Sequence, residues 1–513
     1  MLSADSPAPP PGCGSRPDGT PGPAVAKPSS PWFGRPVGSV RLPAGWVAGV
    51  VAVFVASRAL ACAWGLKFDV TPLYCYWQVA DPALLKIRLL ETLFYLHSQP
   101  PFYNLLGGLA LKLAGVCGPA VTLGAVFHAL GLAAGVALVR LLANLGIRPL
   151  PAFAVTCAYM LTPWVVLHEH TFFYEHLLSS FLLLGLGSAS AYLRHRSLAS
   201  LWLSAAWFCL CCLTTASFHL VWLAVVLGGI CWAAREGRRA AWVGVGAALL
   251  SVGSLHVKNH LVFGSSDLSP GFAYPNLALS VIGGVPRPLV DELEAAGVIS
   301  GLYRTAFMEP TPEVVRQLDR PWGIAVLDQH RWSDGTTINR YCYLYLAVAR
   351  QLQRDALAVL ARYPRYFLVP LRQHLAYYVR PAGDYLPYLD LTRLSVHAQA
   401  YRRWVDRYVL LQPRPGMPAW ALVVGLPAAL LGGCLIGYQD LRQRRDPGRA
   451  ALVFVMVFTV LYIALTMVPL SVAEQNRYRS RADSFSLVLL TLGASELWRR
   501  GRLHGRPTGQ PAR

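Results

Sequence analysis

Long apolar runs alternate with short polar connections along most of this chain. Because a helix needs about 20 apolar residues to cross a bilayer, the sequence predicts roughly ten membrane-crossing helices. They lie near residues 45–65, 119–142, 150–168, 172–193, 199–215, 217–234, 240–257, 417–438, 450–471 and 483–498. The continuous apolar run over 199–234 is interpreted as a hairpin that turns near Thr214–Ser217. The pattern predicts an all-α polytopic membrane protein.

Basic residues between the predicted spans indicate the topology, because Lys and Arg are enriched in cytoplasmic loops. Alternate crossings place all the clusters on one side. The clusters are Arg35 and Arg41; Arg140 and Arg148; Arg194 and Arg196; Arg235, Arg238 and Arg239; Arg442, Arg444, Arg445 and Arg449; and Arg499, Arg500 and Arg502. Both termini are therefore expected in the cytoplasm. The regions expected outside are Leu66–Gln99, His168–Thr171, Asn259–Pro418 and Ser471–Arg481.

Two shorter apolar stretches, Pro100–Gly115 and Tyr366–Val379, are predicted to be interfacial or re-entrant helices on the outer side. If Pro100–Gly115 crossed the membrane, Arg140 and Arg148 would move outside and break the charge pattern. The second stretch carries Arg372 and is left outside for a similar reason.

These elements define a domain organisation. Residues 1–43 are rich in Pro, Gly, Ser and Ala without an apolar core, so they are predicted to form a disordered cytoplasmic tail. Residues 44–258 form an N-terminal transmembrane module that contains the first outer loop. An outer segment with interfacial helices follows at 259–416, then C-terminal transmembrane helices at 417–498 and a cytoplasmic tail at 499–513.

Composition and charge narrow the function classes. Of 513 residues, 54% are hydrophobic and only 14% are charged, which favours one integral membrane domain over several soluble ones. The formal net charge of +20 is a possible sign of nucleic-acid binding. Most of the basic residues lie between apolar runs, however, and no nucleic-acid partner is expected. The eleven cysteines form no metal or redox spacing.

Ionisable side chains gather in the predicted outer regions. They are Asp69, Asp81, Glu91 and His97 in the first loop, His168, Glu169, His170, Glu175 and His176 around the next turn, Lys258 after the seventh span, and Glu474, Arg477, Arg479 and Arg481 in the last turn. A carboxylate there can take a proton from an acceptor hydroxyl or help to hold a divalent metal ion. Guanidinium groups suit an anionic phosphate. The combination suggests chemistry on a lipid-linked phosphate.

Each group also has a simpler interpretation. Asp69 can be a solvated loop acid, and the run from Glu474 to Arg481 can be a solvated charged turn. His168-Glu169-His170 resembles a metal cluster, but adjacent residues of a helix do not share a face. A zinc site there is therefore disfavoured.

An acid soon after the first span, followed by the stretch Phe94-Tyr-Leu-His-Ser-Gln-Pro-Pro-Phe-Tyr-Asn104, resembles the GT-C glycosyltransferases. These include protein O-mannosyltransferases, lipid A aminoarabinose transferases and rhizobial lipopolysaccharide sugar transferases. The resemblance covers 45–260 and, loosely, 450–498, while 261–416 has no counterpart. In this family His, Glu or Gln precedes the Pro pair, and here it is Gln99. No second acid follows Asp69 directly, unlike in some members.

The resemblance implies roles for individual residues. It implies that Asp69 is the catalytic base and that Glu169 is a second catalytic acid, with Asp81 and Glu91 as rival candidates for the base. Asp69 and Glu169 are also candidate ligands of a divalent metal ion. The implied donor phosphate-binding residues are Lys258, Arg477 and Arg479, and the implied supporting residues are His97, Gln99, Glu175 and Glu474.

The implied activity is transfer of a hexose or pentose from a polyprenyl-phosphate donor to a glycan, lipid or protein acceptor outside the cytoplasm, in a bacterial plasma membrane. No nucleotide cofactor is expected, because the sequence has no Walker A motif and no GxGxxG after a strand. The alternative is a membrane transporter or lipid flippase, which predicts ionisable residues deep inside spans. Arg58 and His219 are the main residues of that kind. A non-catalytic membrane scaffold is the third possibility.

Overall fold

The computed structural model describes residues 42–234, 238–305, 308–382, 395–443, 446–471 and 474–504. The predicted N-terminal tail, except residues 42 and 43, and the end of the predicted C-terminal tail lie outside these ranges. The same holds for Arg35, Arg41, Arg235, Arg444 and Arg445 of the basic clusters.

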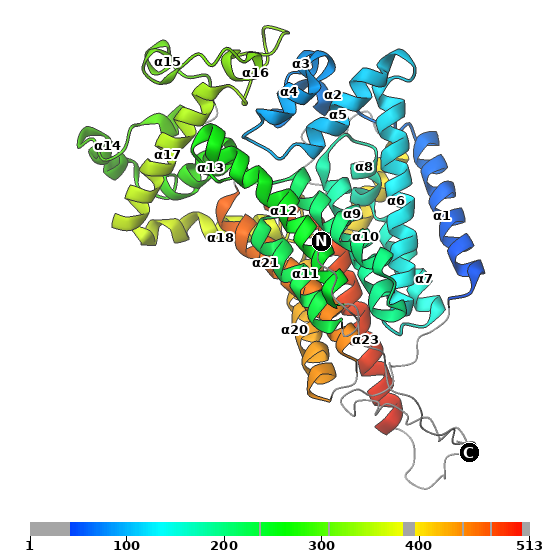
Figure 1. Cartoon of the computed structure of the whole chain (residues 1–513). Coiled ribbons are helices and arrows are strands. Elements are labelled where there is room, and N and C mark those ends of the chain that lie inside the picture. The colour runs from blue at the N-terminus through cyan, green and yellow to red at the C-terminus, as the bar shows by residue number, and fades with distance from the viewer. Residues whose placement is uncertain are drawn as a thin grey trace, which may run out of the picture.

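Within the described ranges the regular elements are helices (Figure 1). The long ones are α1 (Ala44–Ala63), α6 (Pro119–Asn144), α7 (Pro149–Leu161), α9 (Tyr174–His195), α10 (Leu198–Thr214), α11 (Leu220–Ala233), α12 (Arg238–Phe263), α17 (Tyr343–Arg362), α20 (Trp420–Arg442), α21 (Pro447–Leu470) and α23 (Asp483–His504). The shorter ones are α2 (Thr71–Cys75), α3 (Pro82–Ile87), α4 (Leu89–Phe94), α5 (Phe102–Lys112), α8 (Pro163–Glu169), α13 (Pro270–Ile282), α14 (Arg287–Ala295), α15 (Pro312–Leu318), α16 (Ala325–Asp328), α18 (Leu368–Tyr378), α19 (Val396–Trp404) and α22 (Gln475–Ser480).

All ten ranges predicted to cross the membrane contain helix. Six described helices are long and apolar enough to span a bilayer, namely α1, α6, α9, α12 over Ala241–Phe263, α20 and α21. The chain is therefore an integral membrane protein. The apolar helices α10 and α11 are shorter than a typical span, and α11 with 14 residues extends only about 21 Å at 1.5 Å per residue.

The predicted span at 150–168 is not one straight helix. It divides into α7 and α8, whose axes differ by 59°. The break falls at Thr162–Pro163, because proline has no N–H to donate and disfavours helical geometry in the residue before it. If the bent pair is counted as one span, the described chain has seven. Helix α8 therefore leads to residues 170–174 in a different direction from α7.

The predicted hairpin is confirmed, and the two short apolar stretches are helical, while their position at the membrane interface stays a prediction. Helix α10 ends at Thr214 and α11 begins at Leu220, so the chain turns where the sequence indicated. The stretches Pro100–Gly115 and Tyr366–Val379 contain α5 and α18, of 11 residues each. Neither is long enough to cross a bilayer.

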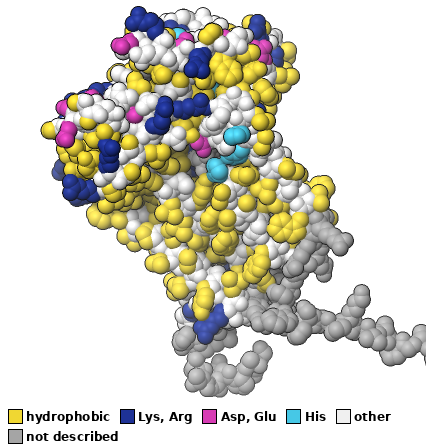
Figure 2. All heavy atoms as spheres, turned by 60° about the vertical axis from the view of Figure 1, so that its left-hand side comes forward, with side chains coloured by type: hydrophobic (Ala, Val, Ile, Leu, Met, Phe, Trp, Pro, Cys, Tyr) yellow, Lys and Arg dark blue, Asp and Glu magenta, His cyan; other side chains and the backbone are white. Residues whose placement is uncertain are grey.

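The helix bundle has two chemically different ends. At one end, called the inner end here, Arg194 donates to Asn144 at 2.9 Å, Arg499 donates to the Gly146 carbonyl at 2.8 Å, and a further ion pair joins α20 to α21. At the opposite, outer end lie α2 to α5 and α13 to α17 (Figure 1). Hydrophobic side chains dominate the body between them on the face in Figure 2, and charged side chains gather at the outer end. That the outer end faces away from the cytoplasm remains a prediction.

The outer segment, for which the sequence suggested no counterpart, folds around a hydrophobic cluster of its own. This cluster packs α13 along α17 and includes Ala278, Val281, Leu352, Ala356 and Val359. Helices α13 and α17 are thereby joined by a core of their own at the outer end.

Candidate active site at the outer end of the bundle

Asp69 is fixed by its backbone to the second predicted outer turn. It forms an isolated parallel β-bridge with Thr171. The Asp69 N–H donates to the His170 carbonyl at 2.7 Å, and the Asp69 carbonyl accepts from the Phe172 N–H at 2.8 Å. The half-buried carboxylate accepts the Thr71 N–H at 2.8 Å. Two outer regions far apart in sequence therefore meet at this acid.

The Pro-Pro stretch reaches the same segment. Tyr103, on α5, donates its hydroxyl to the Phe172 carbonyl at 2.9 Å, and the two rings stack with centroids 4.5 Å apart. The Tyr103 ring also meets Tyr174 edge to face at 5.5 Å. The acid after the first span and the Pro-Pro stretch, which carry the family resemblance, therefore both contact residues 170–174.

Glu169 directly precedes residues 170–174, but its side chain points to α1. Its fully buried carboxylate lies 2.5 Å from the Arg58 guanidinium, which also donates through Nε at 3.1 Å. Gly131 of α6 makes room for it, because a Cβ there would lie 2.8 Å from Glu169 Oε2. The carboxylate is thus already paired with Arg58, and the role of Asp69 and Glu169 as ligands of a divalent metal ion stays a prediction.

Two histidines, His128 and His170, lie beside Glu169, and His128 Nε2 is 3.9 Å from Glu169 Oε1. Nδ1 of His128 lies 2.6 Å from the Gly124 carbonyl, and Nδ1 of His170 lies 2.8 Å from the Val166 carbonyl. Since a carbonyl can only accept, both Nδ1 atoms carry the proton. The two Nε2 lone pairs then face each other at 3.3 Å. Such second-shell bonds typically orient metal-binding histidines, and the spacing also fits a shared proton.

Arg477 and Arg481 form a buried cluster with Glu175 at the start of α9. Glu175 Oε1 lies 3.2 Å from Arg477 Nε and 2.9 Å from Arg481 Nη2. Glu474 adds a second carboxylate 2.5 Å from Arg477. Both guanidinium groups lie against the ring of Tyr174, at 5.5 and 5.2 Å. Two positive and two negative charges are thus held together with very little exposure to water.

The other two predicted phosphate-binding residues have structural partners. Arg479 is buried, forms an ion pair with Asp483 at 2.9 Å, and donates to the carbonyls of Tyr378 and Arg380 at 2.8 Å each. Its guanidinium therefore holds the end of α18. Lys258 donates to the Phe94 and Leu96 carbonyls at 3.0 and 2.6 Å. It ties α12 to the end of α4.

His97 and Gln99 are also buried. The His97 Nε2 lies 2.8 Å from the Tyr341 carbonyl, and Nδ1 lies 3.0 Å from the Ser98 hydroxyl. The Tyr341 hydroxyl in turn donates to the Gln78 carbonyl at 2.7 Å. The side-chain oxygen of Gln99 is buried and has no hydrogen-bond partner among the described residues. The stretch before the Pro pair therefore anchors the outer segment to the first loop.

The imidazole of His97 predicts a pH-dependent stability. Burial lowers the pKa of His97 from 6.5 to about 3, helped by the nearby charges of Lys258 and Arg350. Between these pH values the unfolded chain binds a proton at His97 and the folded chain does not. The contribution of His97 to the free energy of unfolding is therefore fully present above pH 6.5 and is lost as the pH drops toward 3. The melting temperature of His97→Gln should therefore depend less on pH than that of the wild type. The exposed control His260→Gln should follow the wild type, and parallel curves for all three proteins would contradict this account.

An apolar groove lies beside the end of α18. It has a volume of about 530 Å³ and is lined by residues of α18 and α20, among them Leu375, Tyr378, Val379, Trp420 and Leu426. The Tyr378 carbonyl is one of the groups that hold Arg479. The groove thus lies beside the residue that binds Arg479 of the basic turn.

Sequence reasoning named Arg477 and Arg479 as phosphate ligands but did not single out Arg481 or Tyr174. The helical spacing contained the signal, because residues i and i+4 share a helix face. Arg477 and Arg481 have this spacing and meet on Glu175, whereas Arg479 points to α18.

Comparisons with known proteins give the following. No family model and no curated protein matches the chain. Among solved structures it is similar to the archaeal oligosaccharyltransferase AglB from Archaeoglobus fulgidus in complex with an inhibitory peptide and a dolichol-phosphate, with 14% identity over 90% of this chain and 52% of that one and a TM-score of 0.40. It is also similar to ArnT from Cupriavidus metallidurans bound to undecaprenyl phosphate, with 13% identity over 91% of this chain and 82% of that one and a TM-score of 0.30.

The chain spans about half the length of the oligosaccharyltransferase. Because identity and TM-score are both low, the activity of this chain can be inferred only from its own residues.

Proposed function

We propose that this protein transfers a sugar from a polyprenyl-phosphate donor to an acceptor hydroxyl at the outer end of the bundle. The observation that carries the proposal is one short segment, residues 170–175. Its first half pairs with the backbone of Asp69, and its second half provides Tyr174 and Glu175 to Arg477 and Arg481. A candidate base and a buried pair of arginines are thereby held on the same backbone.

Asp69 is the proposed general base. Its carboxylate is half-buried, and an ionised carboxylate can accept several hydrogen bonds beyond the one from Thr71. In the proposed step the acceptor oxygen bonds to the anomeric carbon of the sugar while the bond from that carbon to the phosphate oxygen breaks. The acceptor proton passes to Asp69, and the lipid phosphate leaves with the bonding electrons.

Arg477, assisted by Arg481, is the proposed site for the leaving phosphate. Charges held in a dry, preorganised site stabilise developing negative charge more than exposed ones do. Glu474 is the most exposed member of the cluster, with 17% of its side chain accessible. We propose that the donor phosphate takes the place of the Glu474 carboxylate on Arg477. The apolar groove beside α18 would receive part of the polyprenyl chain.

This exchange predicts the effect of Glu474→Gln. Removing the competing negative charge should tighten binding of polyprenyl phosphate by about fivefold to thirtyfold, which corresponds to about 1–2 kcal/mol. Binding to the purified protein in nanodiscs measures it, with Glu496→Gln at the inner end as the matched control. Unchanged or weaker binding in Glu474→Gln would contradict the exchange.

The roles that the family resemblance implied for three residues are revised in this proposal. Arg479 and Lys258 position α18 and α4 without touching the donor, and Glu169 holds α1 against α8. If a divalent ion takes part, His128 and His170 fit it, with Asp69 brought near by its backbone bond to His170. The ion would supply positive charge to the donor phosphate.

The transporter alternative has less support in the structure. Arg58 is paired with Glu169 inside the bundle, and His219 lies at the start of α11 instead of in the middle of a span. An assay with the purified protein separates the two functions. A transferase forms a glycosidic bond between donor sugar and acceptor and releases the lipid phosphate, whereas a flippase leaves the donor lipid chemically unchanged.

A further inference from the structure

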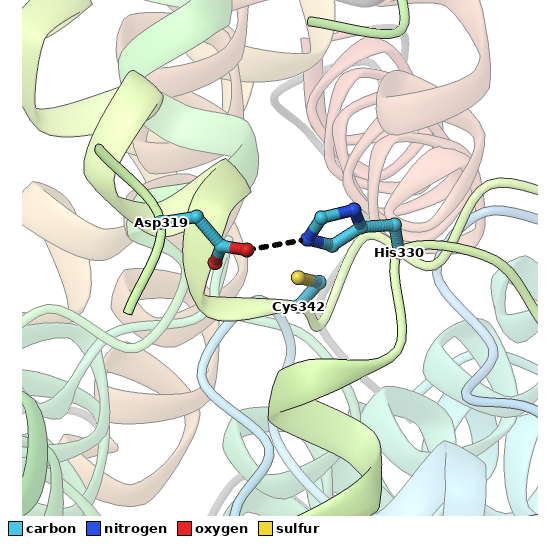
Figure 3. Close-up of side chains that lie close together, drawn as sticks. All are labelled: Asp319, His330 and Cys342. Atoms are coloured by element: carbon cyan, nitrogen blue, oxygen red, sulfur yellow. Dashed lines mark hydrogen bonds and ion pairs between the residues drawn. The ribbon is translucent and has the colours of Figure 1, made fainter. Parts of the chain in front are cut away.

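A second group of metal-ligating side chains lies in the outer segment, apart from the candidate active site. Among the described residues, Asp319, His330 and Cys342 form the one group of three whose ligand atoms all lie within 4.8 Å of one another. His330 Nε2 lies 2.8 Å from Asp319 Oδ2. Figure 3 shows the Cys342 sulfur beside this pair, so that the three side chains point toward a common space.

The backbone holds the three residues in register. Arg331 and Ile338 form an antiparallel bridge, and the Asn339 N–H donates to the His330 carbonyl at 2.9 Å. The Cys342 N–H donates to the Asn339 carbonyl at 3.1 Å. This turn brings His330 and Cys342 together although they are separated in sequence.

Two further features keep the group in place. The fully buried Asn339 donates to the Val326 and Gln329 carbonyls at 2.9 and 2.7 Å. Asp319 caps the end of α15, where its N–H donates to the Val315 carbonyl at 2.9 Å. The ligand atoms therefore come from the end of α15, the bridged turn and the start of α17, where the backbone is already held by hydrogen bonds.

The donor set selects the kind of metal. One imidazole, one carboxylate and one thiol match the ligands of zinc, whereas calcium and magnesium take oxygen ligands. With bonds of about 2.0–2.3 Å, tetrahedral zinc separates its ligand atoms by about 3.3–3.8 Å. Small side-chain rotations from the observed arrangement reach that spacing. We propose that Asp319, His330 and Cys342 bind one zinc ion, with water as the fourth ligand.

Binding would proceed without redox chemistry. His330 would give its Nε2 lone pair and keep its proton on Nδ1, while Cys342 would lose its thiol proton to solvent and bind as thiolate. The site adjoins Tyr341, whose hydroxyl reaches Gln78 and whose carbonyl reaches His97. The ion would therefore clamp the outer segment onto the first outer loop, which positions that loop but does not touch a substrate.

The test is metal binding by the full-length protein in detergent. After treatment with a chelator, the wild type should take up one zinc ion per chain at this site and melt at a higher temperature with zinc than without it. His330→Gln and Cys342→Ser should each weaken zinc binding by more than the about 10- to 100-fold that loss of an outer-shell partner causes. His260→Gln and Cys117→Ser, which alter exposed residues, are the matched controls.

Cobalt gives a second readout, which reports directly whether a thiolate binds the metal. Cobalt bound by the wild type should show thiolate charge-transfer absorption, which His330→Gln should shift and the controls should keep. The proposal is overturned if the wild type retains no zinc, or if all four variants bind it equally. Sugar transfer is not the readout, so this result is separate from the proposed function.

Discussion

Asp69→Asn should lower the rate of sugar transfer by about a hundredfold to ten-thousandfold, the usual cost of removing a general base. Asparagine has nearly the same size but cannot take up a proton. The backbone bonds of Asp69 to His170 and Phe172 do not involve its side chain, so the fold should persist. The measurement is transfer from a polyprenyl-phosphate sugar, with expression and melting temperature recorded for each variant.

The two rival acids provide the controls. Asp81 accepts from the Ser333 N–H and hydroxyl at 2.8 and 2.5 Å and caps α3, so Asp81→Asn should lower stability more than the rate per folded molecule. Glu91 is partly exposed and only 3.4 Å from an exposed Arg88, so Glu91→Gln should change little. A collapse of the rate in Asp81→Asn with normal turnover in Asp69→Asn would reassign the base.

Arg58→Met should destabilise the protein by about 3–5 kcal/mol, because it leaves the Glu169 carboxylate buried without its partner. The double variant Arg58→Met with Glu169→Leu should recover most of that loss, since replacing a whole buried ion pair by apolar residues is often neutral. Chemical unfolding in detergent measures both. Additive losses in the double variant would contradict the assignment of a closed ion pair.

The same double variant separates structure from catalysis. If Glu169 only holds α1 against α8, the double variant should keep most of its transfer activity. A stable double variant without activity would instead make Glu169 part of the reaction, as the family resemblance implied.

Much of the fold was predictable because it depends on local pattern. Apolar length located all ten helical ranges, and polar residues located the turn of the hairpin between α10 and α11. The proline at the Thr162–Pro163 break is apparent in the sequence, but the residues around it are apolar, so 150–168 was predicted as one span. The outer segment was not predictable, because its core joins α13 to α17 across a long, mostly polar stretch of sequence.

The site was less predictable than the fold because side-chain partners are distant in sequence. Asp69 and the Pro-Pro stretch both contact the segment 170–174, which no spacing in the sequence indicates. The partner of Glu169 is Arg58, 111 residues earlier, and the sequence gives no sign of that pairing. Likewise only the folded chain shows that Arg479 donates to the carbonyls of Tyr378 and Arg380 at the end of α18.

The most direct test of the central claim uses purified protein in nanodiscs with a synthetic polyprenyl-phosphate sugar and an extract of candidate acceptors. Mass spectrometry follows the donor lipid. We expect release of free polyprenyl phosphate together with an acceptor product heavier by one sugar, and loss of both in Asp69→Asn. An intact donor in the presence of every acceptor, or equal turnover in wild type and Asp69→Asn, would contradict the proposed function and mechanism.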